Sequence, residues 1–296
     1  MPLLLLLGVG FLIAVTINLA KAAGAAGIVA PEFAFWLAGG AGLVLLAATT
    51  LGGARPDLSP PYLLYYAVTG LIGVAAPNYI GFEVARHAGA AYASVPYALS
   101  PLFTYLLAIL CRLDAPSWLR ITGLVAGCIG TMLVVADMIA AAGDAPLFWL
   151  LGALAMPLLV AVGNVYRTLY WPGDAAPMAL AAGMLIAAAL WLLPVLLLIP
   201  PAAFSAGTLG AAEAILASQV AVSSVMYWLY FRLQRAAGPV YLSQIGYVAA
   251  GFGVVLALIV FGERISLPML AGMVLIVVGV VLVTPRRQHD AAAKPR

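Results

Sequence analysis

The sequence contains few charged residues. Only 8% of its 296 residues are Asp, Glu, Lys or Arg, whereas a soluble globular domain carries about 25%. Hydrophobic residues make up 66% of the chain. A soluble fold could not remove this much apolar surface from water, so the composition excludes a soluble globular protein and indicates that lipid is part of the solvent.

Several function classes are excluded by what is missing. The net charge of +3 is small and the basic residues are scattered, so no nucleic-acid partner is expected. The two cysteines, Cys111 and Cys128, lie in or beside apolar stretches, which suggests small core residues rather than a disulfide framework. No His/Cys cluster, Ser/His pair or Asp/Asp pair occurs in the apolar stretches, so we expect no metal, no cofactor and no enzyme.

Pro, Gly and charged residues divide the chain into ten stretches, each long enough for a spanning helix of about 20 residues. We therefore predict an all-α membrane protein with ten transmembrane helices. The expected helices cover residues 3–21, 32–50, 61–84, 90–111, 117–139, 146–167, 176–199, 209–233, 239–261 and 266–284.

The second half of the chain repeats the first. Residues 79–134 match residues 228–283 without a gap at an offset of 149, and a register of 146 pairs Asn18 with Asn164 and Lys21 with Arg167. Because Asn18 and Lys21 have counterparts inside the chain, we interpret residues 3–21 as a helix and not as a cleaved signal peptide. Duplicated membrane units are typical of transporters.

Five helices in each repeat predict that the second copy is inverted in the membrane. We expect a first repeat at 1–140, an inverted second repeat at 146–284 and a tail at 285–296. With ten spans, ten Lys and Arg residues fall on the side of the termini and three on the other. The positive-inside rule then predicts that both termini and the tail are cytoplasmic.

Several motifs give the chain a family resemblance. They are Asn18 and Asn164, the Ala-Pro steps at 30–31 and 176–177, and the Gly-Glu-Arg step at 262–264 before a glycine-containing last helix. With these motifs the chain resembles ten-helix members of the drug/metabolite transporter superfamily with two EamA-type domains. It is most similar to bacterial aromatic amino-acid exporters. The resemblance implies export of metabolites, often amino acids, across the bacterial inner membrane.

Polar and aromatic side chains within the expected helices are the candidates for a substrate site, since polar groups are costly in lipid and tend to face a cavity. Pro101 is a candidate hinge or gate, although a packing kink is the simpler explanation. Small polar residues also join helices, and Tyr and Trp form interfacial belts, so packing competes with each assignment. The candidate substrate-binding residues are Asn78, Tyr79, Tyr97, Ser100, Asn164, Tyr227, Trp228, Gln244 and Tyr247.

No carboxylate and no Lys or Arg is expected in the middle of a span. This favours a neutral, aromatic, hydrogen-bonding cavity and facilitated or weakly ion-coupled transport, with Glu83 as the best exception. A carrier that exports neutral amino acids, aromatic ones in particular, fits such a cavity. A multidrug or quaternary-cation exporter is the alternative, because aromatic rings attract cations. We expect a small-molecule substrate, a surrounding bilayer and a monomer.

Overall fold

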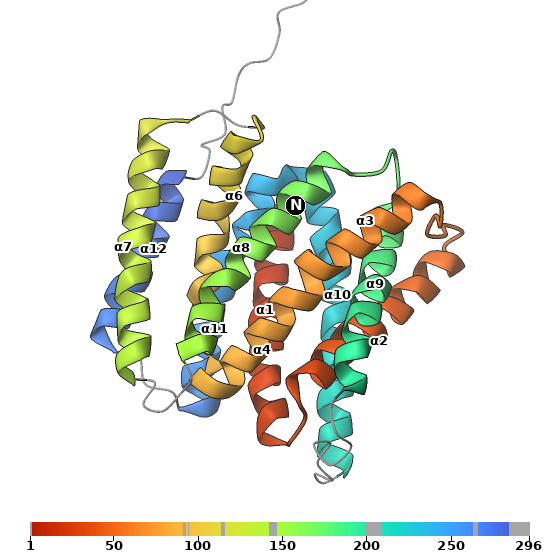
Figure 1. Ribbon diagram of the computed structural model, residues 1–296, viewed down its shortest axis with the longest axis horizontal. Helices are drawn as coiled ribbons and strands as arrows, with labels where there is room; N and C mark the ends of the chain where they lie inside the picture. The colour runs from red at the N-terminus through yellow and green to blue at the C-terminus, as the bar shows by residue number, and fades with distance from the viewer. Residues whose placement is uncertain are drawn as a thin grey trace, which may run out of the picture.

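The computed structural model describes residues 2–90, 93, 95–113, 116–141, 147–198, 209–262 and 266–283, and its regular structure there is entirely helical (Figure 1). The helices follow the ten predicted stretches, so the all-α prediction is confirmed. The tail at 285–296, Asp114 and the Glu263-Arg264 step lie outside the described residues. The helices are α1 (Pro2–Ala25), α2 (Ala30–Leu51), α3 (Pro60–Gly70), η1 (Leu71–Ala75), α4 (Ala76–Ala88), η2 (Val95–Leu99), α6 (Ser100–Leu110), α7 (Trp118–Ala141), α8 (Leu147–Leu169), α9 (Pro177–Leu197), α10 (Leu209–Ser243), α11 (Ile245–Phe261) and α12 (Leu267–Val283).

Within the described ranges, 6 helices are long and apolar enough to cross a membrane: α1, α2, the continuous rod of α3, η1 and α4, then α8, α9 and α10. Shorter apolar helices occupy 100–110, 245–261 and 267–279. Proline stands in the first turn of α2, α3 and α9. A proline is favoured there because the first helical N–H groups need no intrahelical partner.

Two predicted helices depart from regular α geometry. The rod of α3 and α4 contains a π-turn at Leu71–Ala75, just before Pro77. Pro77 has no N–H to donate to the carbonyl of Gly73, which disturbs the ladder at this turn. The stretch at 90–111 is also irregular, because residues 95–99 form a 3₁₀ segment ahead of α6.

The boundary predicted between 233 and 239 is a kink and not a loop. Helix α10 continues to Ser243 through Gly238, whose φ of 73° and ψ of 178° are non-helical. Gly89, which precedes Gly238 by the repeat offset, has φ 108° and ψ 158°. Both positions therefore need a residue without Cβ, and the chain turns sharply at matching points of the two copies.

The helices pack in pairs that relate the two halves of the chain. Helix α7 packs against α12 at one end of the molecule, and α2 packs against α9 at the other (Figure 1). Between these pairs, α1 contacts α10 and α11, whereas α8 contacts α4 and α6. Exchanging the copies converts the neighbours of α1 into those of α8, so the contact pattern is reciprocal.

Glycines bring α7 and α12 together. A methyl group added to Gly130 would lie 2.6 Å from the carbonyl oxygen of Gly272, and one added to Gly279 would meet the carbonyl oxygen of Gly123. The repeat offset converts the first contact into the second. Small residues allow such close backbone contact between helices in lipid.

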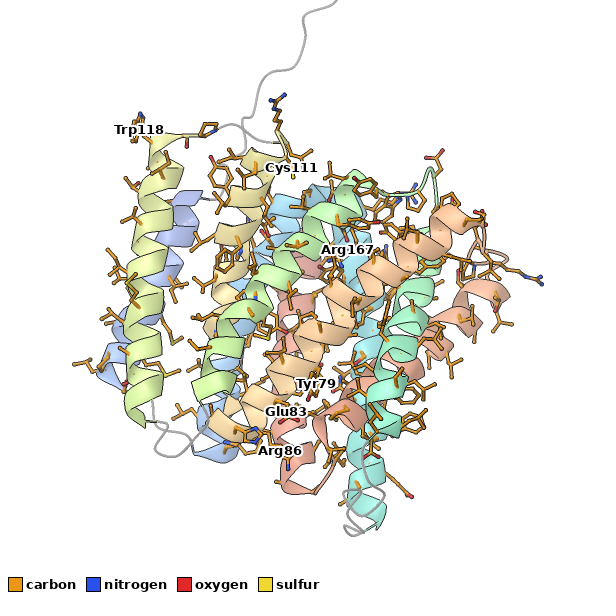
Figure 2. All side chains as sticks on the ribbon, in the orientation of Figure 1. Tyr79, Glu83, Arg86, Cys111, Trp118 and Arg167 are labelled. Carbon is orange, nitrogen blue, oxygen red and sulfur yellow. The ribbon has the colours of Figure 1, made fainter. Side chains whose placement is uncertain are left out.

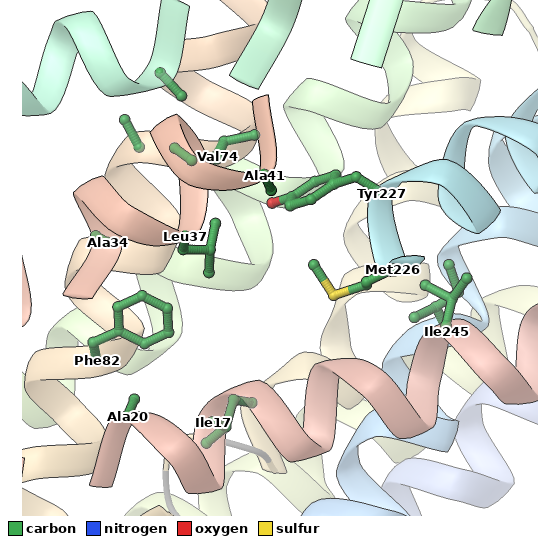
Figure 3. Close-up of a cluster of buried hydrophobic side chains, with 14 of the residues drawn as sticks. Ile17, Ala20, Ala34, Leu37, Ala41, Val74, Phe82, Met226, Tyr227 and Ile245 are labelled. Carbon is green, nitrogen blue, oxygen red and sulfur yellow. The ribbon is translucent and has the colours of Figure 1, made fainter. Parts of the chain in front are cut away.

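The buried core joins the centre of the bundle. Figure 3 shows side chains from α1, α2, the α3–α4 rod, α10 and α11 converging on one cluster, with the Tyr227 ring among them. The labelled members are Ile17, Ala20, Ala34, Leu37, Ala41, Val74, Phe82, Met226, Tyr227 and Ile245. This cluster flanks the cavity described next.

Candidate substrate-binding cavity

A small cavity lies at the centre of the bundle, between α1, the π-turn and start of α4, η2, α8 and α10. Its volume is about 50 Å³, which is room for about three or four waters. The lining is largely apolar, but both halves of the chain supply polar groups. The polar side chains lining the cavity are Thr16, Asn78, Tyr97, Arg167, Tyr227 and Tyr230.

A second cavity of about 30 Å³ lies beside the first. Ser100, Asn164 and Ser243 contribute its other polar side chains. Tyr97 and Tyr230 line both cavities, so these two aromatic side chains lie where the cavities adjoin. Movement of either ring would change the connection between them.

The position of Tyr97 depends on a close backbone approach between η2 and α11. A methyl group on Gly246 would lie 2.9 Å from the carbonyl carbon of Tyr97 and 3.5 Å from Cδ of Pro101. Only a residue without Cβ fits here unless the backbones separate. Tyr97 and Gly246 are also equivalent in the repeat, so the two copies touch at the same register.

Arg167 is fully enclosed near the end of α8, with 1% of its surface exposed. Its Nη2 donates to Oδ1 of Asn164 and to the Tyr230 hydroxyl, both at 2.6 Å, and its Nε donates to Oε1 of Gln234 at 3.1 Å. The guanidinium also lies 5.2 Å from the centre of the Tyr230 ring. In Figure 2 its side chain lies within the bundle, between helices of both halves.

Five of the predicted site residues lie at these cavities. Asn78, Tyr97 and Tyr227 line the larger one, and Asn78 Nδ2 lies 3.4 Å from the Tyr227 hydroxyl. Ser100 and Asn164 line the smaller one together with Tyr97. The structure therefore brings together residues of α4, η2 and α6 from the first copy and of α8 and α10 from the second copy.

The other four predicted residues lie outside the lining of both cavities. Trp228 is 38% exposed, and Cζ of Arg232 lies over its ring, 4.9 Å from the centre of the Trp228 ring. Tyr79 lies on α4 one turn from Glu83, Gln244 lies between α10 and α11, and Tyr247 lies on α11. The predicted hinge residue Pro101 is in the first turn of α6.

Sequence reasoning missed Arg167 as a site residue. It was expected among the cytoplasmic surface charges at a helix end, but its side chain is buried and lines the larger cavity. One available signal was its spacing of three residues from Asn164, which puts both on one face of a helix. The same spacing separates Asn18 and Lys21 in the first copy.

Glu83 also differs from expectation, because it is only 7% exposed although it lies near a helix end. Its Oε2 is 3.2 Å from Nδ1 of His87, one turn further along α4. Figure 2 shows Tyr79, Glu83 and Arg86 grouped at the end of the molecule opposite Cys111 and Trp118. Glu83 therefore lies apart from the lining of both cavities.

Comparison with known proteins agrees with this architecture. A solved crystal structure of another protein superposes on 94% of this chain and 95% of its own, with a TM-score of 0.68 and 21% sequence identity. This likeness shows a shared fold. No curated protein sequence matches the chain. Residues 1–136 match the sequence profile of the EamA-like transporter family, a family of membrane transporters of small molecules.

Proposed function

We propose that the protein is a carrier that exports neutral amino acids, aromatic ones in particular, by alternating access. The observation that carries the proposal is the central cavity, to which both halves contribute hydroxyl, amide and aromatic groups. Such a lining suits a solute with an apolar body and a small polar end. Transport is facilitated or only weakly coupled to ions.

The proposed mechanism uses two inverted five-helix repeats in the bacterial inner membrane, at 1–140 and 146–284, with cytoplasmic termini. Three features support it: the repeat offset, the reciprocal glycine contacts of α7 and α12, and the matching glycine turns at 89 and 238. In an inverted pair, each half can adopt the conformation of the other. Exchange of the two conformations then exposes the cavity alternately to the two sides.

The cavity must widen before a solute enters, because its present volume fits only a few waters. Tyr97 and Tyr230, at the junction of the two cavities, are the proposed narrow point of the pathway. Asn78, Tyr227 and Asn164 are proposed to bind the polar end of the solute. The remaining predicted residues, Tyr79, Trp228, Gln244 and Tyr247, would contact it only after the helices move.

The test is counterflow in proteoliposomes that contain the purified full-length protein. Vesicles loaded with unlabelled phenylalanine should take up labelled phenylalanine transiently, and excess tryptophan should abolish the uptake whereas a cationic dye should not. The Tyr97→Ala variant should lose most of this signal, whereas Tyr170→Ala, at a residue that is 60% exposed, should retain it. Counterflow of the dye but not of any amino acid would replace this proposal with the quaternary-cation alternative.

A further inference from the structure

We propose that Arg167 binds a carboxylate group of the transported solute. The inference rests on the proposed function, because it takes the central cavity to be the transport site. It adds a binding residue and fixes one chemical group of the substrate. Three observations lead to it: the isolation of the Arg167 charge, the surplus of hydrogen-bond donors around it, and its place in the cavity wall.

The first observation concerns charge. Among the described residues, no Asp or Glu lies within ion-pair distance of Arg167, and all of its hydrogen-bond partners are neutral. A buried charge is normally paired, since removal from water costs several kcal/mol even after relaxation. An ionisable side chain kept inside a membrane bundle is therefore expected to meet its counter-ion during function.

The second observation concerns hydrogen bonds. Within the described part of the chain, the sulfur of Met184, at 3.9 Å, is the only hydrogen-bond partner of Nη1 of Arg167. Among the described residues, Nε2 of Gln234, whose other amide atom accepts from Arg167, has no partner. Each of these groups can donate, and buried donors are normally satisfied. A carboxylate offers about four acceptor positions and no donor, so it has the chemistry that this cluster lacks.

The third observation concerns access. Nη1 lies against Gly73 of the π-turn, where any added Cβ would collide with it, and within 3.4 Å of a methyl group placed on Gly163. Gly73 and Arg167 both line the larger cavity. Gly73 is thus a point where the lining of the larger cavity contacts the least satisfied end of the guanidinium. The bonds to Asn164 and Tyr230 are made by Nη2 and not by Nη1, so a solute that binds Nη1 would not compete with them.

These contacts define a substrate class. The solute carries a carboxylate at Arg167 and an apolar body against the rings of Tyr97 and Tyr230. A zwitterionic amino acid with a neutral side chain has this chemistry, and so does an aromatic monocarboxylate. A quaternary cation does not, because the unneutralised guanidinium would repel it at short range in a medium of low dielectric constant.

The experiment measures equilibrium binding to the purified full-length protein by competition with labelled phenylalanine. The competitors are phenylalanine, phenylalaninamide, which lacks the carboxylate, and 3-phenylpropionate, which lacks the ammonium group. We expect wild type to bind the amide about ten- to a hundredfold more weakly than the acid, as for loss of charged hydrogen bonds. Retention of 3-phenylpropionate would assign the site to carboxylates in general, and its loss would restrict the site to zwitterions.

The variants separate this inference from the proposed function. Arg167→Gln should remove the preference for acid over amide, and Arg167→Lys should keep part of it. Gly73→Ala retains the arginine but displaces Nη1, and it should weaken acid binding selectively, which provides a second test if Arg167→Gln does not fold. Binding of phenylalanine with an unchanged acid-to-amide ratio in folded variants would overturn the role of Arg167 while the carrier proposal stands. Wild-type protein that neither binds nor transports any of these solutes would overturn both.

Discussion

The glycine contacts between α7 and α12 predict a stability effect that can be worked out from the structure. In Gly130→Ala the new methyl group would lie 2.6 Å from the Gly272 oxygen and 2.9 Å from the Ile276 nitrogen. An ordinary C···O contact is about 3.3–3.6 Å, so the backbones must separate by about 0.7–1 Å. Overpacking of this kind costs about 1–3 kcal/mol, against about 1 kcal/mol that alanine gains over glycine in a helix.

The net expectation is a loss of up to about 2 kcal/mol in the free energy of unfolding, or up to about 8 °C in the melting temperature of the purified protein in detergent. Gly279→Ala should behave alike, because its methyl group would lie 2.7 Å from the Gly127 nitrogen. The double variant should lose less than the sum, since one separation of the helices relieves both clashes. Gly251→Ala is the matched control, as a Cβ there meets nothing within 4 Å. Equal melting shifts at positions 130 and 251 would refute the reasoning.

Three further predictions address orientation, the cavity and ion coupling. Cys111 is exposed at the end of α6, so with the other cysteine replaced, a membrane-impermeant maleimide should label it only after cells are opened; labelling of intact cells would place the termini outside. Tyr227→Ala should reduce transport at least tenfold, whereas Trp228→Ala, at the exposed neighbouring residue, should reduce it less than threefold. A larger loss of transport in Trp228→Ala than in Tyr227→Ala would move the site to the outer face of α10. Glu83 pairs with His87 away from the cavity lining, so wild type and Glu83→Gln should both keep a steady-state solute ratio near one under an imposed pH gradient. If wild type instead accumulates solute about tenfold per pH unit and Glu83→Gln does not, the protein is coupled to protons through Glu83.

Apolar stretches and proline positions were sufficient to predict where the helices lie. This succeeds because a chain in lipid must satisfy its backbone hydrogen bonds within each segment, so every long apolar stretch forms a helix. The same reasoning could not predict the π-turn at 71–75 or the 3₁₀ segment at 95–99. The π-turn follows from the missing N–H of Pro77, and hydropathy carries no information about such changes in backbone hydrogen bonding.

The site was predictable in part for a related reason. The amides and hydroxyls of Asn78, Tyr97 and Asn164 stand out in an apolar helix, and they do lie at the cavities. Arg167 did not stand out, because a basic residue near a helix end usually extends to the membrane surface. Its burial follows from the neutral partners supplied by α10, Tyr230 and Gln234, which only the folded structure brings near.

The π-turn at Leu71–Ala75, which contains Gly73, makes the two halves of the chain unequal. Helix α10, which occupies the corresponding place in the second copy, is regular throughout its described length up to Gly238. In the proposed transport cycle, the two end states would therefore differ in free energy, although the helices that form them are related by repetition. For an uncoupled carrier, detailed balance requires the ratio Vmax/KM to be the same in both directions. The structural asymmetry must then appear as a higher KM and a proportionally higher Vmax on one face of the membrane.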